Sequence, residues 1–339
     1  MLMSAGLGTR LHPFTEMTSK ALLPILGIPS AQYVVENLQF SGVKTIVANV
    51  HHKSELTEKG LLALGHSSLE IKVSDESKKL LGSAGGILQA STNFGGEPFF
   101  LANADVLCDL DWRQLEACHD QLRGQFGVSL TLAVFPKAPL GGTYREVLFD
   151  SQTHLMTGLG ELSTEKAFYI GAAILESESL VRVPTHGSSD FVSTILEPAV
   201  REKKVGVFLT SGIWCDIGTP SLWLDTHFTL ISYLEAGYFP NPRMKNWQRL
   251  LEEKNVRLQE GQWVYSQYAR KCQNPVWSSP CYWGLDSSQS DDLNESQAIP
   301  QFLGPYGVLY GKLTSDQIAL GAGKGKGIGY AGYWVSACR

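Results

Sequence analysis

Two neighbouring stretches near the start of the chain carry two glycines and two basic residues: Ser4-Ala5-Gly6-Leu7-Gly8-Thr9-Arg10-Leu11-His12-Pro13-Phe14-Thr15 and Ser19-Lys20-Ala21-Leu22-Leu23-Pro24. The apolar residues before Gly6 predict a buried strand, so the loop would follow the carboxyl end of that strand, where open α/β sheets bind ligands. Glycines let backbone N–H groups approach an anion without a Cβ in the way. Arg10 adds a planar guanidinium and Lys20 a mobile ammonium. Together these residues predict a phosphate-binding loop.

Two better-known phosphate loops do not fit this pattern. A Walker loop has four residues between its glycines and then Gly-Lys-Ser/Thr, whereas one residue separates Gly6 from Gly8. The dinucleotide fingerprint needs a third glycine three residues after Gly8, where Leu11 stands. A plain glycine turn that caps a strand is disfavoured, because Gly-x-Gly-Thr-Arg occurs together with Pro-x-Thr and Lys-x-Leu-x-Pro.

The composition indicates a globular chain that is long enough for two domains. It has 339 residues, of which 43% are hydrophobic and 18% are charged, and a net charge of -5. That charge gives no basic surface for nucleic acid. We find neither an apolar run of the ~20 residues that a membrane span needs nor the charged start of a signal peptide. We therefore expect a cytoplasmic protein without nucleic-acid or membrane partners, and reduced thiols at its six cysteines.

Apolar runs alternate with helical patterns over residues 1–135, which predicts a doubly wound α/β sheet of the Rossmann-like type. The glycine-rich residues 136–180 predict mixed strands that form one wall of a substrate pocket. The expected strands are 45–50, 69–73, 98–102, 128–134 and 168–175. The expected helices are 29–40, 56–64, 85–90, 111–123 and 190–202.

The pattern changes after residue 227. We expect a first domain over residues 1–227, a helical connector over 228–255 and a β-rich region over 256–339. Short apolar pairs between Gly, Pro and Ser in this last region predict a degenerate left-handed β-helix. Its aromatic residues suit a subunit contact, so we expect a homo-oligomer that forms through it.

Four motifs, in order, resemble those of the sugar-phosphate nucleotidylyltransferases. The glycine loop resembles the family signature, and Leu81-Gly82-Ser83-Ala84-Gly85-Gly86-Ile87 resembles its base-binding loop. Leu101-Ala102-Asn103-Ala104-Asp105-Val106 resembles its Asn-Gly-Asp strand end, and Ile213-Trp214-Cys215-Asp216-Ile217-Gly218-Thr219-Pro220 resembles its Trp-x-Asp-x-Gly-Thr-Pro element. The resemblance, to the mannose-1-phosphate guanylyltransferase and N-acetylmuramate-1-phosphate uridylyltransferase types, covers residues 1–227. It implies transfer of a nucleotidyl group from a nucleoside triphosphate to a sugar 1-phosphate, with release of pyrophosphate.

The resemblance also implies a role for individual residues. Asp105 and Asp216 would bind Mg²⁺, Arg10 would hold the β- and γ-phosphates, and Lys20 would bridge the α-phosphate and the sugar phosphate. Arg10, Lys20 and Asp105 are the implied catalytic set. The residues implied in substrate binding are Gly6, Gly8 and Thr9 of the loop, Gly82, Ser83 and Gly85 near the base, Asn103 near hydroxyl groups, and Glu161 and Gly171 near the sugar. Asp105 and Asp216 lie 111 residues apart in the sequence, so the sequence alone does not show that they meet.

One departure from the family bears on turnover. Many relatives carry a Phe-x-Glu-Lys-Pro element whose lysine grips the sugar phosphate, and residues 158–163 here read Gly-Leu-Gly-Glu-Leu-Ser. Lys166 would replace that lysine only if the loop bends. The alternative hypotheses are a catalytically weak relative that binds sugar nucleotides and regulates a partner, and a cytidylyltransferase that acts on choline or another alcohol phosphate. The sequence leaves the choice between UTP and GTP open.

Overall fold

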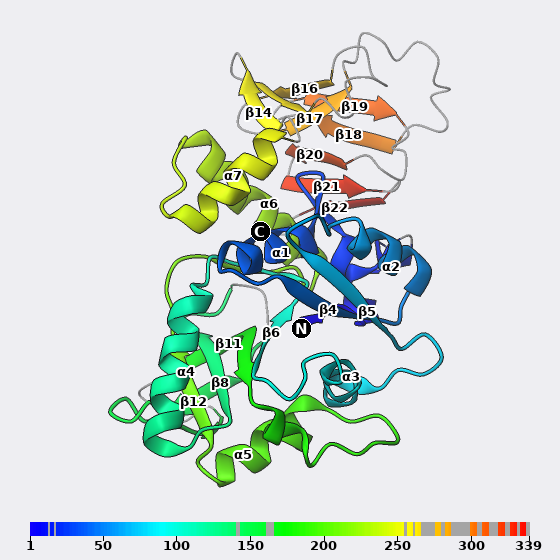
Figure 1. The fold of residues 1–339 in the computed structure, drawn as a ribbon. Helices are drawn as coiled ribbons and strands as arrows, with labels where there is room; N and C mark the ends of the chain where they lie inside the picture. The colour runs from blue at the N-terminus through cyan, green and yellow to red at the C-terminus, as the bar shows by residue number, and fades with distance from the viewer. Residues whose placement is uncertain are drawn as a thin grey trace. The chain divides into compact units, whose positions relative to one another are not determined.

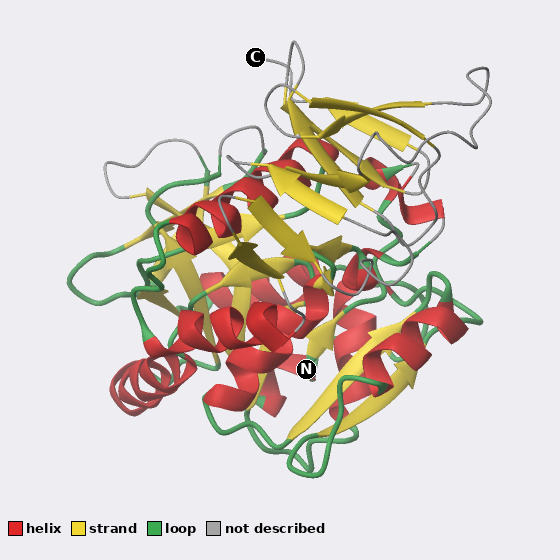
Figure 2. Cartoon of the chain, turned by 90° about the horizontal axis from the view of Figure 1, so that it is seen from above, coloured by secondary structure: helices red, strands yellow, loops and turns green. Residues whose placement is uncertain are grey.

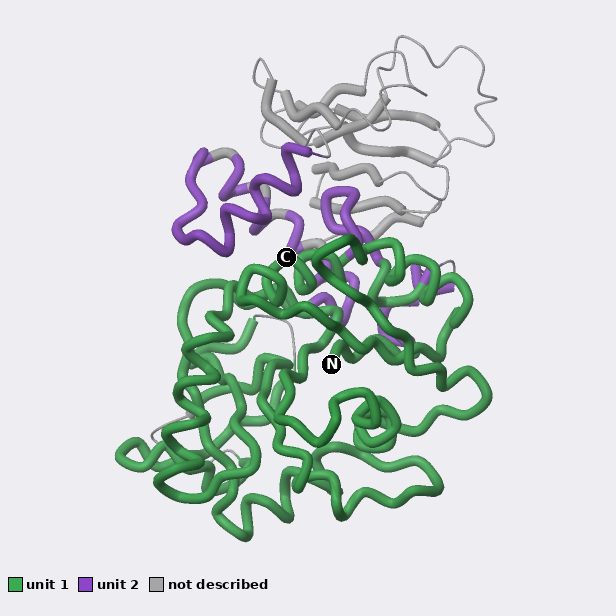
Figure 3. The backbone as a smooth tube through the Cα atoms, in the orientation of Figure 1, with its two compact units in different colours: residues 1–7, 19–22, 30–216 green, residues 8–18, 23–29, 217–339 purple. Residues whose placement is uncertain are grey.

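The structure is a computed structural model that describes residues 1–12, 14–16, 18–139, 143–160 and 166–253, together with nine strands between residues 256 and 336. Its backbone divides into two compact units (Figure 3). Unit 1 consists of residues 1–7, 19–22 and 30–216. Unit 2 consists of residues 8–18, 23–29 and 217–339. The chain therefore changes unit four times before residue 31, three of them between Gly6 and Pro24.

A nine-stranded mixed sheet forms the centre of unit 1 (Figure 1). The path of hydrogen-bonded neighbours runs β10-β9-β11-β6-β1-β4-β5, and β8 joins β11 to β12. β1, β4, β5 and β6 are parallel, whereas β11 is antiparallel to β6 and to β8. The mixed sheet confirms the expected fold class of this part of the chain. The strands are β1 (Leu2–Met3), β4 (Thr45–Val50), β5 (Glu70–Asp75), β6 (Phe99–Asn103), β8 (Leu130–Phe135), β9 (Glu146–Phe149), β10 (Met156–Leu159), β11 (Lys166–Leu175) and β12 (Val205–Leu209).

Helices cover both faces of this sheet, because alternate residues of its strands enter two separate cores (Figure 2). In β4, Ile46 and Ala48 pack in one core, and Val47 packs in the other. The first core takes residues from α1, α2 and α4, and the second takes residues from α3 and α5. The helices of unit 1 are α1 (Ser30–Phe40), α2 (Ser54–Leu62), α3 (Gly82–Ser91), α4 (Trp112–Phe126) and α5 (Glu197–Arg201), and a π-helical turn (Val192–Leu196) leads into α5.

In unit 2, the segment after Gly8 is fastened to helix α6 (Pro220–Glu235). The Trp223 side chain is fully buried, its indole Nε1 donates to the Pro24 carbonyl oxygen at 2.9 Å, and its ring lies 4.9 Å from the Phe14 ring. Thr219 caps α6, since its Oγ1 accepts from Leu222 N at 3.3 Å. Unit 2 also contains β2 (Pro24–Ile25), β3 (Ile28–Pro29) and α7 (Pro242–Glu253). The Gly-Thr-Pro of the fourth motif is therefore a helix start.

Helix α6 continues through residue 227, so the expected domain boundary there falls inside a helix. The strands described after residue 255 pair as antiparallel hairpins, whereas the coils of a β-helix pair in parallel. The expected β-helix is therefore not confirmed. These strands are β14 (Val256–Gln259), β15 (Gln262–Tyr265), β16 (Pro275–Ser278), β17 (Tyr282–Leu285), β18 (Ile299–Leu303), β19 (Gly307–Gly311), β20 (Ile318–Ala322), β21 (Lys326–Tyr330) and β22 (Tyr333–Ser336).

A buried histidine makes α6 sensitive to acid. His227 Nδ1 donates to the Trp223 carbonyl oxygen at 2.9 Å, and burial lowers the pKa of His227 from 6.5 to about 4. The unfolded chain therefore binds a proton more readily than the folded chain between these two pKa values. We therefore expect the contribution of His227 to the free energy of unfolding to be fully present above pH 6.5 and to fall by up to about 3 kcal/mol as the pH drops towards 4.

We expect His227→Phe to reduce this loss of stability, because the phenylalanine side chain has no group that takes up a proton. The measurement is the urea midpoint at pH 7.5 and at pH 4.5, compared with the wild type and with His186→Phe, whose histidine is exposed. An equal fall in midpoint for all three proteins would contradict the prediction.

Candidate active site

The two predicted metal-binding aspartates lie on neighbouring strands. Asp105 occupies the turn between β6 and β7 (Val106–Cys108), and Asp216 ends β13 (Trp214–Asp216). β13 runs antiparallel to β7, with Asp216 opposite Val106. Asp216 is therefore one register position away from Asp105. The structure thus brings together two carboxylates whose proximity the sequence does not show.

Lys20 contacts Asp105 directly. Its Nζ forms an ion pair with Asp105 Oδ2, and the two side chains are 15% and 18% exposed. The fully buried Ser30 Oγ, at the start of α1, lies 3.0 to 3.2 Å from the carbonyl oxygens of Lys20, Ala21 and Ala104. One hydroxyl thus braces the lysine-bearing segment against the turn that carries Asp105. Ser30 lies in none of the recognised motifs, so the sequence alone does not indicate its role.

The predicted residues Asn103 and Gly171 also meet. Gly171 lies in β11 with φ +75°, where the ladder between β11 and β8 shifts register. A Cβ at Gly171 would stand 2.7 Å from Asn103 Nδ2 and 2.9 Å from its Cγ. Gly171 is therefore needed both for its backbone conformation and for the room that it leaves to Asn103.

We expect Gly171→Ala to destabilise the protein and to displace Asn103. The left-handed conformation alone costs a residue with a Cβ about 1–2 kcal/mol, and the contact with Asn103 adds to it. Gly158→Ala in β10 is the matched control, because the nearest atom to its Cβ would lie 4.0 Å away. Urea denaturation measures the cost in free energy. Equal stabilities of the two variants would show that Gly171 needs neither the room nor the conformation.

The start of α3 is tied to residues 189–191. Gly82 has φ +74°, and a Cβ there would lie 2.4 Å from the Ser189 carbonyl oxygen. Ser83 Oγ accepts from Phe191 N at 2.7 Å and lies 3.3 Å from Asp190 Oδ2. Gly85 is buried, and a Cβ at this position would lie only 3.0 Å from Leu81 Cβ. These residues form a compact loop that the structure holds through Ser189 and Ser83.

The buried carboxylate of Glu76 connects the start of α3 to β4 and, through Asn49, to the residues that follow β1. Glu76 is 3% exposed, and its Oε1 accepts from Asn49 Nδ2 at 2.7 Å while its Oε2 accepts from Leu81 N at 3.1 Å. Asn49 Oδ1 in turn accepts from Ser4 N at 2.8 Å. A Cβ at Gly86 would lie 2.4 Å from Glu76 Oε1. Glu76 lies outside the recognised motifs, and its role depends on these long-range contacts.

The remaining predicted residues are placed as follows. Gly6 is exposed in unit 1, and no atom lies within 4 Å of the position of a Cβ. Gly8, Thr9 and Arg10 belong to unit 2, where Gly8 has φ +64° and its carbonyl oxygen accepts from Thr15 Oγ1 at 2.9 Å. The side chains of Thr9 and Arg10 are exposed. Glu161 lies outside the described residues.

The Cys108 thiol of β7 is protonated near neutral pH. Cys108 and Cys118 are free thiols among the described residues. Burial raises the pKa of Cys108 to about 12, so this thiol does not supply a nucleophile.

The donor set suits a hard cation. Asp105 and Asp216 offer carboxylate oxygens, and Mg²⁺ is usually held by one or two carboxylates, with phosphate oxygens and water as its other ligands. Within the described part of the chain, no group of three or more His, Cys, Asp or Glu side chains is arranged to hold a metal. The two carboxylates therefore fit a hard divalent cation such as Mg²⁺.

Known proteins of similar sequence and fold come from one group of enzymes. A family model described as nucleotidyl transferase matches residues 1–140. N-acetylmuramate alpha-1-phosphate uridylyltransferase of Neisseria meningitidis serogroup B is 29% identical over 219 residues, which cover 65% of this chain and 92% of that protein. Residues 1–140 therefore form a nucleotidyl transferase domain, and the chain is similar to sugar-phosphate nucleotidylyltransferases over about two thirds of its length.

Other relatives of the nucleotidylyltransferase domain are longer than the matched region. Mannose-1-phosphate guanylyltransferase catalytic subunit beta of Danio rerio is 27% identical over 66% of this chain, and the chain spans 62% of its length. Two solved structures share the fold. HddC of Yersinia pseudotuberculosis in complex with GMP-PN has a TM-score of 0.53 at 20% identity, covering 67% of this chain and 97% of its own. A putative glucose-1-phosphate thymidylyltransferase of Bacillus anthracis has a TM-score of 0.57 at 15% identity, covering 67% and 93%.

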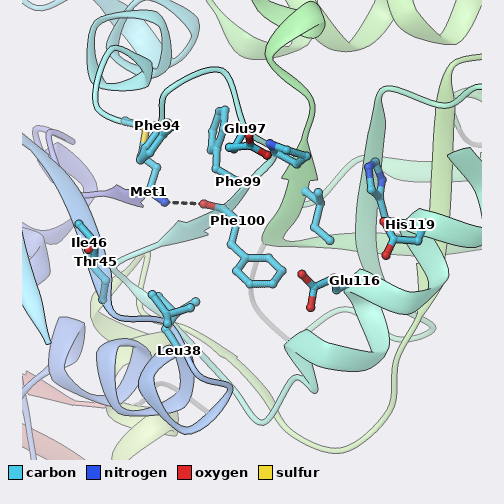
Figure 4. A pocket seen from close by; sticks show the side chains of 14 residues that line it. Met1, Leu38, Thr45, Ile46, Phe94, Glu97, Phe99, Phe100, Glu116 and His119 are labelled. Carbon is cyan, nitrogen blue, oxygen red and sulfur yellow. Dashed lines mark hydrogen bonds between the residues drawn. The ribbon is translucent and has the colours of Figure 1, made fainter. Parts of the chain in front are cut away.

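A cavity of about 460 Å³ lies at the amino ends of strands of the sheet, whereas Asp105 follows the carboxyl end of β6 (Figure 4). Thr45 and Ile46 at the amino end of β4 and Phe99 and Phe100 at the amino end of β6 line it. Leu2 in β1 pairs with both β4 and β6, so the cavity lies between β4 and β6, beyond the amino end of the short strand β1. Open α/β sheets bind substrates at the carboxyl ends of their strands, so we do not assign the reaction to this cavity.

Among the described residues, no helix is both long and apolar enough to span a membrane.

Proposed function

We propose that the chain transfers a nucleotidyl group from a nucleoside triphosphate to a sugar 1-phosphate. An oxygen of the sugar phosphate attacks the α-phosphorus, the bond between that phosphorus and the bridging oxygen breaks, and pyrophosphate leaves. The observation that carries the proposal is the meeting of Lys20, Asp105 and Asp216 at one edge of the sheet. Such transfers depend on positioning and charge neutralisation rather than on a protein nucleophile.

The residues of the site would divide this work. The Lys20 ammonium would bind the phosphate oxygens that approach Asp105, and Arg10 would bind the triphosphate tail. Asp105 and Asp216 would hold Mg²⁺, which supplies neutralisation of phosphate charge when it is bound. Asn103, placed against Gly171, would bind a hydroxyl of the ribose or the sugar. The start of α3 would bind the base through its backbone, which Ser189 and Glu76 hold in place.

The test is a panel of UTP, GTP and other triphosphates against sugar 1-phosphates, which include N-acetylmuramate 1-phosphate and mannose 1-phosphate, with detection of pyrophosphate. We expect release that requires both substrates and Mg²⁺. The uridylyl and guanylyl relatives make UTP and GTP the first triphosphates to try.

A sugar-nucleotide-binding regulator is the alternative, and residues 161–165, where many relatives carry their lysine, lie outside the described residues. Binding of an NDP-sugar by calorimetry without pyrophosphate release from any pair would favour this alternative over the enzyme. The presence of Lys20, Asp105 and Asp216 together argues for turnover, because a protein that only binds sugar nucleotides has no need to neutralise a leaving pyrophosphate.

A further inference from the structure

Tyr144 holds one of the two carboxylates of the site. It lies just before β9, and its hydroxyl donates to Asp216 Oδ2 at 2.9 Å. None of the four motifs contains Tyr144, and the loop that precedes it has no periodic pattern.

Aromatic packing fixes the position of the Tyr144 ring. Its centroid lies 5.1 Å from that of Trp214 at an interplanar angle of 61°, an edge-to-face arrangement. Trp214 packs in turn against Phe135, at 6.1 Å, and is 9% exposed. Trp214 and Asp216 are alternate residues of β13, so their side chains share one face of the strand. Tyr144 therefore reaches Asp216 from the face that Trp214 covers, and the packing sets the direction of its hydroxyl.

From this geometry we propose that Tyr144 is a positioning residue, which orients the Asp216 carboxylate towards the divalent cation of the site. This inference rests on the proposed function, because it assumes that Asp216 binds the cation. A carboxylate that is free to rotate must lose that freedom when it binds a metal, and a fixed donor removes part of the cost. Hydrogen-bond partners of metal ligands commonly change metal affinity by about 10- to 100-fold.

The decisive variant is Tyr144→Phe, which keeps the ring and its contact with Trp214 and removes only the hydroxyl. The probe is Mn²⁺ alone, and its binding to the purified protein is followed through the electron paramagnetic resonance signal of the free ion. We expect the Mn²⁺ dissociation constant to rise about 10-fold or more, and Asp216→Asn to lose Mn²⁺ binding. Tyr238→Phe is the matched control, since Tyr238 is 63% exposed, and it should bind Mn²⁺ like the wild type.

Kinetics supply a second readout. Tyr144→Phe should raise the concentration of Mg²⁺ at half-maximal rate and leave the KM for the sugar 1-phosphate unchanged at saturating Mg²⁺, which a general loss of structure would not do. Wild-type Mn²⁺ affinity in Tyr144→Phe, together with lost affinity in Asp216→Asn, would overturn the positioning role and leave the proposed function standing. Failure of the wild type to bind Mn²⁺ would overturn the metal site and the positioning role together.

Discussion

Asp105→Asn and Asp216→Asn are each expected to lower turnover by about 10²-fold or more, with the fold intact. Each change removes a negative charge from one of the two aspartates that the pairing of β7 with β13 places one register position apart. The asparagine keeps the size of the side chain, and the Asp105 side chain is 18% exposed, so neither variant leaves a large buried hole.

The measurement is the rate of pyrophosphate release at saturating Mg²⁺, with circular dichroism as the check on folding. Asp120→Asn on α4 is the control, because Asp120 is exposed and lies against the cavity at the other edge of the sheet. Wild-type rates in both Asp105→Asn and Asp216→Asn would show that the metal assignment is wrong.

Lys20→Ala is expected to lower the maximal rate by about 10²-fold, the effect of removing one donor from a preorganised charged site. Arg10→Ala should instead raise the KM for the nucleoside triphosphate, because Arg10 is expected to bind the tail that leaves. Lys20→Arg should not restore the rate, since the planar guanidinium does not reproduce a compact ammonium beside Asp105.

These two variants separate binding from chemistry only if both parameters are measured for each substrate. Initial rates over a matrix of the two substrate concentrations give the KM and the maximal rate together. If Lys20→Ala and Arg10→Ala changed the same parameter by the same factor, the division of roles between them would fail.

Local pattern predicted most elements of unit 1, because their burial follows their own sequence. The strand expected over 45–50 is β4, and the helix expected over 29–40 is α1, which begins one residue later. The helix expected over 111–123 extends to Phe126, and its cap is Asp111, whose Oδ1 accepts from Gln114 N. In each case the period of the apolar residues, 2 or 3.6, is set by the element itself.

The geometry of the site could not be predicted in this way, because it depends on contacts between distant residues. The proximity of Asp105 and Asp216 follows from the pairing of β7 with β13, and no local pattern specifies that pairing. Tyr144 comes from a loop without periodicity, and Glu76 acquires its role only through Asn49 and Leu81. Gly171 was found by resemblance, and its physical reason, the approach of Asn103, became visible only in the structure.

The anchoring of Phe14 and Pro24 on Trp223 has a consequence for protein engineering. The segment after Gly8 and α6 lie about two hundred residues apart in the sequence, yet the Phe14 ring and the Trp223 indole must fit each other. A chimera that joins residues 1–216 of this chain to the remainder of a relative would set a foreign helix against the native loop. Recombination within this family should therefore exchange residues 8–29 and α6 as one inherited block.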